Sequence, residues 1–402
     1  MREKIKSVHF ERENDKPQRA TNDFGLDAAK KAIAFHATFP EYAPTPLAML
    51  KELAASLGVK DICIKDESHR FGLNAFKGLG GSYCIGTYAA RALGSDIGNL
   101  SYERILQEKD RLGDITFVTA TDGNHGRGIA WTANKLGFKS VVYMPKGSAE
   151  ERLRNIKALG ADASITDMNY DDTVRFAAET AEKNGWVLVQ DTAWEGYTDI
   201  PKWIMQGYTT MAYEALEQLG DKKPTHVFLQ AGVGAMSGAV TAFFADVCPG
   251  ADKPIITIVE PDQADCLYRT AAANDGKLHP VTGDMATIMA GLACGEPCTI
   301  GYEMLAAYAE NFVSMPDNIA AKGMRILGNP LGADQRVVSG ESGAAPLGLV
   351  AEVLQNETLA WLKEQLQLDK NSVILCFSTE GDTDKDNYRK IVWDGAYANT
   401  GH

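Results

Sequence analysis

Apolar and polar positions follow two alternating patterns along almost the whole chain. Short, nearly continuous apolar runs are typical of strands that are buried on both faces of a sheet. The runs that predict strands are "DICIK" (61–65), "ITFVTAT" (115–121), "SVVYMP" (140–145), "ASITD" (163–167), "WVLVQD" (186–191), "HVFLQAG" (226–232), "PIITIVE" (254–260) and "SVILCFST" (372–379).

Segments between these runs have the apolar spacing of amphipathic helices. Residues 128–137, 149–160 and 171–185 each end at a glycine, where helices often terminate. Strands that alternate with helices predict an α/β fold, with a mostly parallel twisted sheet flanked by helices and crossover connections.

The domain organisation follows from the absence of any internal repeat or low-complexity linker in the sequence. A second domain is therefore expected to be inserted into the first rather than to follow it. Residues 85–202 carry a four-strand αβ series of their own. We predict a smaller inserted α/β domain at 85–202, within a large domain of residues 1–84 and 203–402.

Composition and charge narrow the class of protein. The 402 residues are 45% hydrophobic and 23% charged, as in a globular protein. A net charge of −13 argues against nucleic acid and anionic membranes as partners. No apolar run is long enough to span a bilayer, and residues 1–19 lack the apolar core of a signal peptide.

The seven cysteines are scattered, with no C-x-x-C pair and no zinc spacing. This usage predicts a reducing cytoplasm and no metal site. We interpret Cys266, Cys294 and Cys298 as isolated buried thiols, and a redox pair among them stays an open alternative.

The first candidate for chemistry is Lys77, in the stretch "RFGLNAFKGLGG" (70–81). Helical apolar spacing begins here, with Asn74 as the expected N-cap. A cation is disfavoured at this end of a helix dipole. Lys77 either reaches solvent, as most lysines do, or has a pKa lowered by burial and the dipole so that its amine forms a Schiff base.

A second candidate is the segment "TATDGNHGRG" (119–128), between a predicted strand and a predicted helix. Its glycines permit close approach of a ligand, and the helix N-terminus favours an anion such as a carboxylate. Asp122 adds a carboxylate, Asn124 an amide and His125 an imidazole. The alternative is a structural turn in which Asp122 caps the helix.

A third candidate is "LQAGVGAMSGAV" (229–240), where a strand leads through glycines into a helix. Such a loop can hold a phosphate on its backbone N–H groups. No Gly-Lys-Ser/Thr follows, so it is not a Walker loop. It nearly matches a dinucleotide fingerprint, with Glu260 as the ribose-binding acid, and a nicotinamide-dependent oxidoreductase therefore stays an alternative.

The last predicted strand ends at Ser378 and Thr379 in "CFSTEGDTD" (376–384), and "WVLVQD" ends at Asp191. Ligands of such sheets gather at the carboxyl ends of strands. A lysine at a helix start, an anion loop, a phosphate cradle and a strand end with hydroxyl groups are together the parts that a pyridoxal phosphate enzyme needs.

The order of "NAFKGLGG", "TDGNHG", "GVGAM" and "STEGD" resembles the fold-type II pyridoxal phosphate enzymes. Longer blocks, among them "QDTAWEGYTDIPKWIMQGY" and "GDMATIMAGLACGEP", are similar to the ammonia-lyases of that group that act on 2,3-diaminopropionate. The resemblance covers nearly the whole chain. It implies pyridoxal 5'-phosphate as cofactor and, as an expectation, a homodimer.

The resemblance implies roles for individual residues. Lys77 is the lysine that binds the cofactor aldehyde, and Asn124 contacts its phenolic oxygen. Ser378 or Thr379 faces the pyridine nitrogen. The residues expected to wrap the phosphate are Gly232, Val233, Gly234, Ala235 and Met236.

The substrate is expected to bind at Thr121, Asp122, Gly123 and His125. Dehydratases of the group usually carry serine where this chain has Asp122, and Asp191 is a second carboxylate able to reach the same cleft. We therefore expect Lys77, Asp122 and Asp191 to be catalytic, in an α,β-elimination of ammonia from both isomers of 2,3-diaminopropionate. A serine or threonine dehydratase and a non-catalytic amino-acid sensor on the same scaffold are the alternatives.

Overall fold

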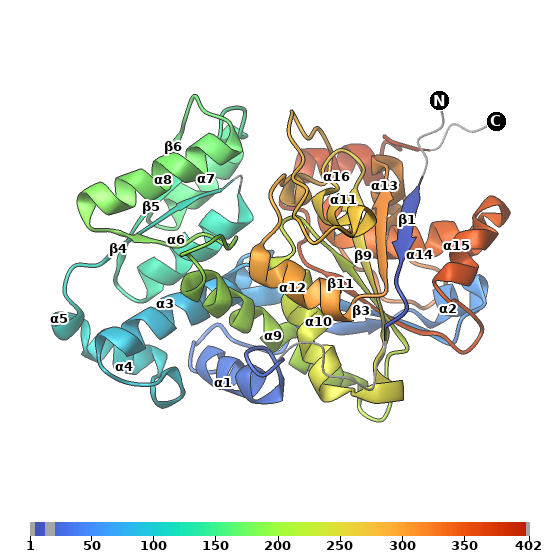
Figure 1. Cartoon of the computed structure of the whole chain (residues 1–402), viewed down its shortest axis with the longest axis horizontal. Helices are drawn as coiled ribbons and strands as arrows, with labels where there is room; N and C mark the ends of the chain where they lie inside the picture. The colour runs from blue at the N-terminus through green and yellow to red at the C-terminus, as the bar shows by residue number, and fades with distance from the viewer. Residues whose placement is uncertain (1–4, 13–20, 122, 399–402) are drawn as a thin grey trace.

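The structure is a computed structural model that describes residues 5–12, 21–121 and 123–398. Two β-sheets organise this part of the chain, one with seven strands and one with four. The four-stranded sheet and its helices lie to the left in Figure 1, and the seven-stranded sheet lies to the right. The fold is α/β, as the sequence predicts.

The seven-stranded sheet has the strand order β1-β10-β9-β8-β11-β3-β2. Its central strands run parallel, whereas the edge strands β1 and β2 are antiparallel to their neighbours. The strands are β1 (Lys6–His9), β2 (Leu47–Met49), β3 (Asp61–Asp66), β8 (His226–Gln230), β9 (Ile255–Pro261), β10 (Asn311–Met315) and β11 (Val373–Ser378).

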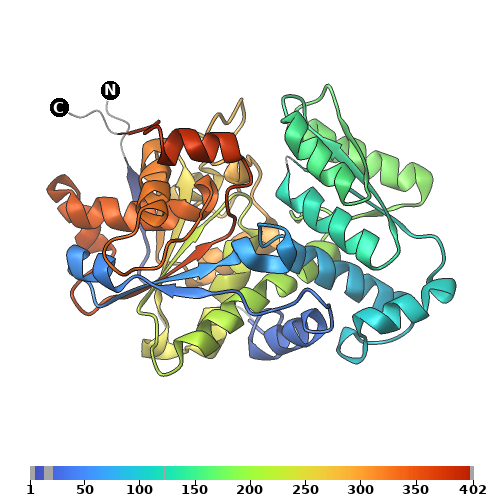
Figure 2. The same ribbon diagram turned by 180° about the vertical axis from the view of Figure 1, so that it is seen from behind.

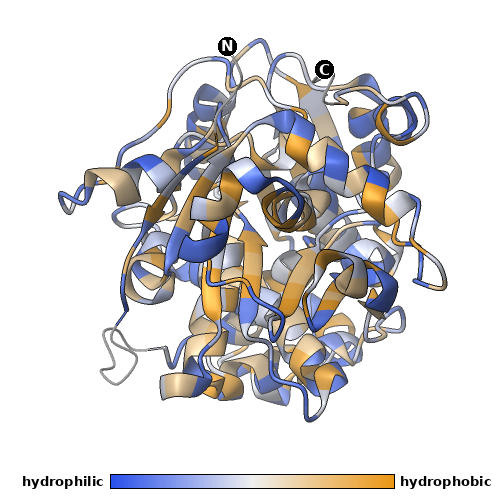
Figure 3. Ribbon diagram, turned by 90° about the vertical axis from the view of Figure 1, so that its right-hand side faces the viewer, coloured by the Kyte–Doolittle hydropathy of each residue, from blue (hydrophilic) through white to orange (hydrophobic). Residues whose placement is uncertain are grey.

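Both faces of this sheet are buried, which explains the continuous apolar runs. On β11, Leu375 and Phe377 pack on one side with α9, α10 and α12, whereas Ile374 and Cys376 pack on the other with α13 and α14. Figure 3 shows the central strands in hydrophobic colours and the outward faces of many helices in hydrophilic ones.

The helices around the large sheet divide between these two faces. One group consists of α1 (Leu26–His36), α3 (Gly78–Ala92), α9 (Asp199–Leu219), α10 (Ala235–Val247) and α12 (Thr299–Tyr308). The other consists of α2 (Lys51–Leu57), α13 (Asp317–Gly328), α14 (Glu341–Gln355), α15 (Ala360–Gln365) and α16 (Lys385–Val392). Other helical elements are η1 (Glu67–Gly72), η2 (Ile97–Asn99), α4 (Tyr102–Gln107), α5 (Lys109–Leu112), η3 (Gly250–Asp252), α11 (Cys266–Ala273), η4 (Ala290–Leu292) and η5 (Glu357–Leu359).

The four-stranded sheet is parallel throughout and has the order β6-β5-β4-β7. Its strands are β4 (Thr116–Ala120), β5 (Lys139–Met144), β6 (Asp162–Ile165) and β7 (Val187–Leu188). One face packs against α6 (Asn124–Lys135) and α7 (Glu150–Ala158), the other against α8 (Tyr170–Asn184). Helix α3 contacts both α6 and α9, and it crosses between the two sheets in the views of Figures 1 and 2.

Every strand that the apolar runs predict is present, with ends that differ by a few residues. The runs missed β1, β2 and β10, because the edge strands are short and β10 has the mixed sequence "NFVSM". The small sheet comes from one continuous stretch of chain between β3 and β8. The predicted domain boundaries at 84/85 and 202/203 stay predictions, and they fall within α3 and α9.

No helix in the described part of the chain combines the length and the apolar character needed to cross a membrane.

Candidate active site

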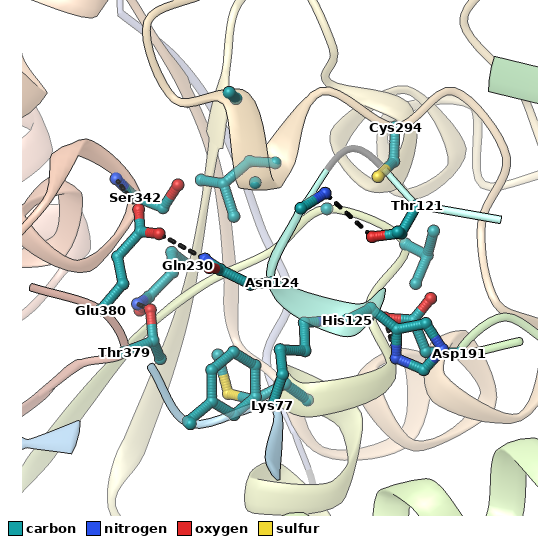
Figure 4. A pocket seen from close by; sticks show the side chains of 18 of the residues that line it. Lys77, Thr121, Asn124, His125, Asp191, Gln230, Cys294, Ser342, Thr379 and Glu380 are labelled. Carbon is teal, nitrogen blue, oxygen red and sulfur yellow. Dashed lines mark hydrogen bonds and ion pairs between the residues drawn. The ribbon is translucent and has the colours of Figure 1, made fainter. Parts of the chain in front are cut away.

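A pocket lies at the carboxyl ends of strands from both sheets (Figure 4). Its wall on the small sheet comes from the segment after β4, and its opposite wall from segments after β8 and β11. Parallel strands bring their carboxyl ends to one edge of a sheet, so residues far apart in sequence meet there. The predicted residues that line the pocket are Lys77, Thr121, Gly123, Asn124, His125, Asp191, Gly232, Val233, Gly234, Ala235, Met236 and Thr379.

Lys77 is the N-cap residue of α3, which begins at Gly78. The prediction that Asn74 caps this helix is wrong. Asn74 has a left-handed backbone with φ of 56°, and its Nδ2 donates to Asp382 Oδ1 at 3.1 Å. Its side chain therefore binds the loop after β11, and no side chain caps the first turn of α3.

The Lys77 amine is an ion-pair partner of Asp191, with Nζ 2.5 Å from Oδ2. Burial lowers the pKa of Lys77, but the Asp191 carboxylate more than offsets this and raises the pKa above its usual value. The sequence-based expectation of a lowered pKa is thus wrong for this arrangement. Burial raises the pKa of Asp191, but His125 and the Lys77 ammonium together lower it below its usual value, so both Lys77 and Asp191 are charged at neutral pH.

His125 lies beside this pair as a buried imidazole, 5% exposed. Its Nε2 donates to the Val189 carbonyl at 2.8 Å, so Nε2 carries the hydrogen of the neutral ring. Burial lowers the pKa of His125, and the Lys77 charge adds to this while Asp191 opposes it. The unprotonated Nδ1 lies 3.6 Å from Asp191 Oδ2 and has no hydrogen-bond partner.

The loop after β4 is shaped by Thr121. Its Oγ1 accepts hydrogen bonds from the backbone N–H groups of Gly123 at 3.0 Å and Gly126 at 3.2 Å. Helix α6 then begins at Asn124, so its free N–H groups face the pocket. Asp122 lies outside the described residues.

The glycine loop after β8 leads into α10, which begins at Ala235. Gly234 has φ of +92°, a left-handed conformation that L side chains rarely adopt, and this turn aims the N-terminus of α10 into the pocket. Such a terminus is a ready binding site for a phosphate.

Several buried polar atoms in the pocket wall have no hydrogen-bond partner in the structure. They are His125 Nδ1, Arg127 Nε, Gln230 Oε1 and Ser342 Oγ. Buried polar atoms are normally satisfied, so this pattern indicates a polar ligand. These features fit pyridoxal phosphate. The amine can bind its aldehyde, the helix N-terminus can bind its phosphate, and the polar atoms can contact its ring.

The strand end of β11 separates the two hydroxyl candidates. Ser378 is fully buried, donates to Ser339 Oγ at 2.8 Å and is not among the residues that line the pocket. Thr379 lines the pocket, and its Oγ1 accepts from Gln230 Nε2 at 2.7 Å. The structure therefore brings Thr379, and not Ser378, to the candidate site.

Among the pocket residues that were not predicted from the sequence are two carboxylates, Glu380 and Glu341. Glu380 Oε2 accepts from Asn124 Nδ2 at 2.6 Å, across 256 residues of chain. Glu341, at the start of α14, has its pKa raised to about 7 by burial and by the nearby Glu380 charge. Glu380 lies in the segment 376–384 quoted above, but no local pattern distinguishes either acid from the acids of ordinary loops.

The structure gives the dinucleotide alternative no support. Glu260 is buried and accepts from the backbone N–H groups of Leu267 at 2.9 Å and Tyr268 at 2.6 Å, in the first turn of α11. Its carboxylate therefore binds the N-terminus of α11, and Glu260 does not line the pocket. Among the described residues, Cys266, Cys294 and Cys298 form no disulfide bond; Cys266 and Cys298 are buried as predicted, whereas Cys294 is only half-buried.

Comparison with known proteins identifies the family. Residues 38–364 match the family described as "Pyridoxal-phosphate dependent enzyme". The chain is 53% identical to the diaminopropionate ammonia-lyase of Escherichia coli (strain K12) over 378 residues, 93% of this chain and 94% of that one. The chain belongs to the diaminopropionate ammonia-lyase family. The Salmonella typhimurium member is also 53% identical, over 92% of each chain.

Solved structures of this family agree with the fold described above. The holo diaminopropionate ammonia-lyase from Escherichia coli superposes with a TM-score of 0.92 at 49% identity, covering 98% of both chains. The same enzyme in complex with an aminoacrylate-PLP azomethine reaction intermediate has a TM-score of 0.90. Maize serine racemase, at 20% identity and a TM-score of 0.70, shares the fold.

Proposed function

We propose that this member of the diaminopropionate ammonia-lyase family eliminates ammonia from 2,3-diaminopropionate, with pyridoxal phosphate as cofactor. One diaminopropionate and one water give one pyruvate and two ammonia molecules. The observation that carries the proposal is the placement of the Lys77 amine, paired with Asp191, opposite the glycine loop in a single pocket. The two relatives that are 53% identical to this chain are named as ammonia-lyases of this substrate.

The proposed roles divide the pocket into three parts. The N-terminus of α10 and residues 232–236 bind the cofactor phosphate, and Thr379 faces the pyridine ring. The loop of Thr121, Gly123 and His125 binds the substrate carboxylate at the start of α6. When bound, the cofactor supplies an electron sink for the bond that breaks at the α carbon.

The proton-handling residues are Lys77 and Asp191. Lys77 binds the cofactor aldehyde covalently and, once released, accepts the α proton on its own face of the cofactor. Asp191 holds the Lys77 ammonium in place when the lysine is not bound to the cofactor, since its Oδ2 lies 2.5 Å from Nζ. A substrate with two amines also gives this carboxylate an ammonium to bind while Lys77 is engaged.

The first prediction tests Lys77. Lys77→Ala and Lys77→Arg should both lower pyruvate formation from diaminopropionate by at least about a hundredfold, because a guanidinium stays protonated and forms no imine. Borohydride reduction of the wild-type protein with cofactor should label the peptide that contains Lys77. Lys60→Ala, at an exposed position, is the matched control. Near-normal turnover in Lys77→Ala would contradict the proposal.

A second prediction concerns Asp122, whose role is proposed from the sequence. The α proton of the D- and L-isomers points to opposite faces of the cofactor when the carboxylate binds in the same loop. One base cannot easily serve both faces, since misplacement by about 1 Å can cost a hundredfold. With Lys77 as base for the L-isomer, Asp122 is the base for the D-isomer.

Asp122→Asn should therefore lower kcat/KM for the D-isomer by about a hundredfold and affect the L-isomer far less, because an amide keeps the shape but takes no proton. Each isomer serves as the control for the other on the same variant. Equal losses for both isomers would show that Asp122 acts in binding or in protonation of the leaving amine. A single base would then remove the α proton from both isomers.

The dehydratase alternative has weaker support. The threonine dehydratases among the relatives, such as that of Escherichia coli (strain K12), are 25% identical over 57% of this chain. We also propose that the chain works as a homodimer in the cytoplasm, which is supported by scattered cysteines with no C-x-x-C pair.

A further inference from the structure

Glu380 is a buried carboxylate to which the proposed reaction gives no role. Its side chain lines the pocket and the residue is 6% exposed. Across residues 5–12, 21–121 and 123–398, no lysine, arginine or histidine forms an ion pair with it, although the Arg127 charge acts on it at longer range. Buried carboxylates are rarely left without a cation, because desolvation of the charge is costly. Its placement therefore calls for a specific reason.

Three hydrogen-bond donors from separate segments hold the Glu380 carboxylate in place. The backbone N–H of Ser342 in α14 donates to Oε1 at 3.3 Å, and Thr383 Oγ1 lies 3.5 Å from Oε2. The shortest bond, at 2.6 Å, comes from Asn124 Nδ2. Gly340 leaves the room for this side chain, since a Cβ there would lie 3.0 Å from Glu380 Cγ.

The bond to Glu380 determines which way the Asn124 amide faces. A carboxylate only accepts hydrogen bonds, so the amide nitrogen, and not its oxygen, must point toward Glu380. An amide nitrogen carries two hydrogens, and Glu380 Oε2 takes one of them. The second N–H is left for a ligand in the pocket that Asn124 lines.

The same bond joins the two walls of the pocket (Figure 4). Asn124 begins α6, after strand β4 of the four-stranded sheet, and Glu380 follows strand β11 of the seven-stranded sheet. A short bond between a charged acceptor and an amide is stronger than one between neutral groups. It therefore sets the position of Asn124 relative to the wall that carries Thr379.

We propose that Glu380 is a positioning residue for the cofactor, which holds the Asn124 amide so that its second N–H meets the phenolic oxygen of pyridoxal phosphate. This inference rests on the proposed function, and on the expected contact of Asn124 with that oxygen. The inference assigns a role to Glu380, on the wall opposite Asn124. Glu380 holds the Asn124 amide in place and puts a negative charge next to it.

Other charged groups lie around Glu380. Glu341 stands next to it with a pKa of about 7, because burial and the Glu380 charge both disfavour a second carboxylate there. Arg127 in α6 and Asp384 are the other charged groups that act on this pair.

The test compares Glu380→Ala and Glu380→Gln with Asp382→Ala as matched control. Asp382 lies two residues away and also accepts from an asparagine, Asn74, but it does not line the pocket. Two quantities are measured without substrate on protein freed of cofactor: the Kd for pyridoxal phosphate, and the pH midpoint of the visible absorbance change of the bound cofactor.

Glu380→Ala should weaken the Kd by about tenfold or more, as expected for a lost charge-assisted bond, and lower the pH midpoint, because a nearby negative charge is gone. Glu380→Gln should recover much of the affinity, since its amide oxygen accepts the same hydrogen, but keep the lowered midpoint. Asp382→Ala should leave both quantities unchanged.

A double-mutant cycle shows whether Glu380 acts through Asn124. Glu380→Ala should weaken the Kd in the wild-type background and have almost no further effect in Asn124→Ala. Additive losses, or a Glu380→Ala protein that behaves like Asp382→Ala, would overturn the inference. A wild-type protein that formed no adduct at Lys77 would instead overturn the proposed function, so the two failures are distinguishable.

Discussion

At the scale of single residues, side chains from other elements set the protonation of the pocket. Lys77, Asp191 and His125 come from three segments of the chain, and their charges depend on one another. An amine that burial alone would neutralise is kept as an ammonium by the carboxylate beside it. The chemistry of Lys77 is thus inseparable from Asp191.

Glu341 provides a prediction of pH dependence at this scale. Its pKa is raised from 4.5 to about 7 by burial and by Glu380. Between these values the unfolded chain releases the proton that the folded protein keeps, so this group makes the folded state less stable as pH rises. The loss from a shift of this size is about 3 kcal/mol.

Glu341→Gln should remove this contribution, because a glutamine does not titrate. The difference in unfolding free energy between the variant and the wild type should therefore grow in favour of the variant between about pH 4.5 and pH 7. Denaturant unfolding at a series of pH values measures it. A difference that stays constant over this window would show that the Glu341 pKa is not raised.

At the scale of elements, close helix contacts place Lys77. A Cβ on Gly128 of α6 would lie 2.8 Å from the Lys77 backbone, and a Cβ on Gly207 of α9 would lie 2.3 Å from the Leu79 carbonyl oxygen. Helix α3 is therefore held between α6 and α9 at distances that only glycine permits. Its N-terminus, and with it Lys77, is positioned from both sides.

Gly207→Ala should push α3 away from α9 and cost about 1 to 3 kcal/mol, as overpacking of a core does. The displacement of α3 should also lower kcat for the proposed elimination, since small errors in placement are costly. Glu217→Ala, at an exposed position of the same helix, is the control. Thermal unfolding and turnover of the two variants are compared, and an unchanged Gly207→Ala protein would contradict the packing argument.

At the scale of the whole molecule, the two sheets make the pocket together, and neither sheet carries a complete site. The small sheet supplies Asn124 and His125, whereas the large sheet supplies the glycine loop and Thr379. A bond such as the one between Asn124 and Glu380 therefore links the stability of both halves to the geometry of the site.

The proposed homodimer is a prediction at this scale. Sedimentation equilibrium of the full chain with cofactor should give twice the mass of one chain over a range of protein concentrations. Trp393, which is 82% exposed in the single chain, offers a fluorescence probe for dilution experiments. A single-chain mass at every concentration would contradict the dimer and leave the proposed reaction untouched.

Much of the fold and part of the site are determined by the sequence itself. Continuous apolar runs specify strands buried on both faces, and glycines next to a strand end specify turns that few other residues can adopt. These are local requirements, so β3, β4, β8 and β11 could be located, and with them Lys77, the loop at Asn124 and the glycines at 232 and 234.

Only the tertiary structure decided the environment of those residues. The position of Thr379 in the pocket wall and of Ser378 outside it, the ammonium state of Lys77 and the bond from Asn124 to Glu380 each depend on partners distant in the chain. A local sequence pattern indicates which chemical groups a segment carries, but not which groups surround them. Charge, pKa and hydrogen-bond direction depend on distance in space, and folding alone sets those distances.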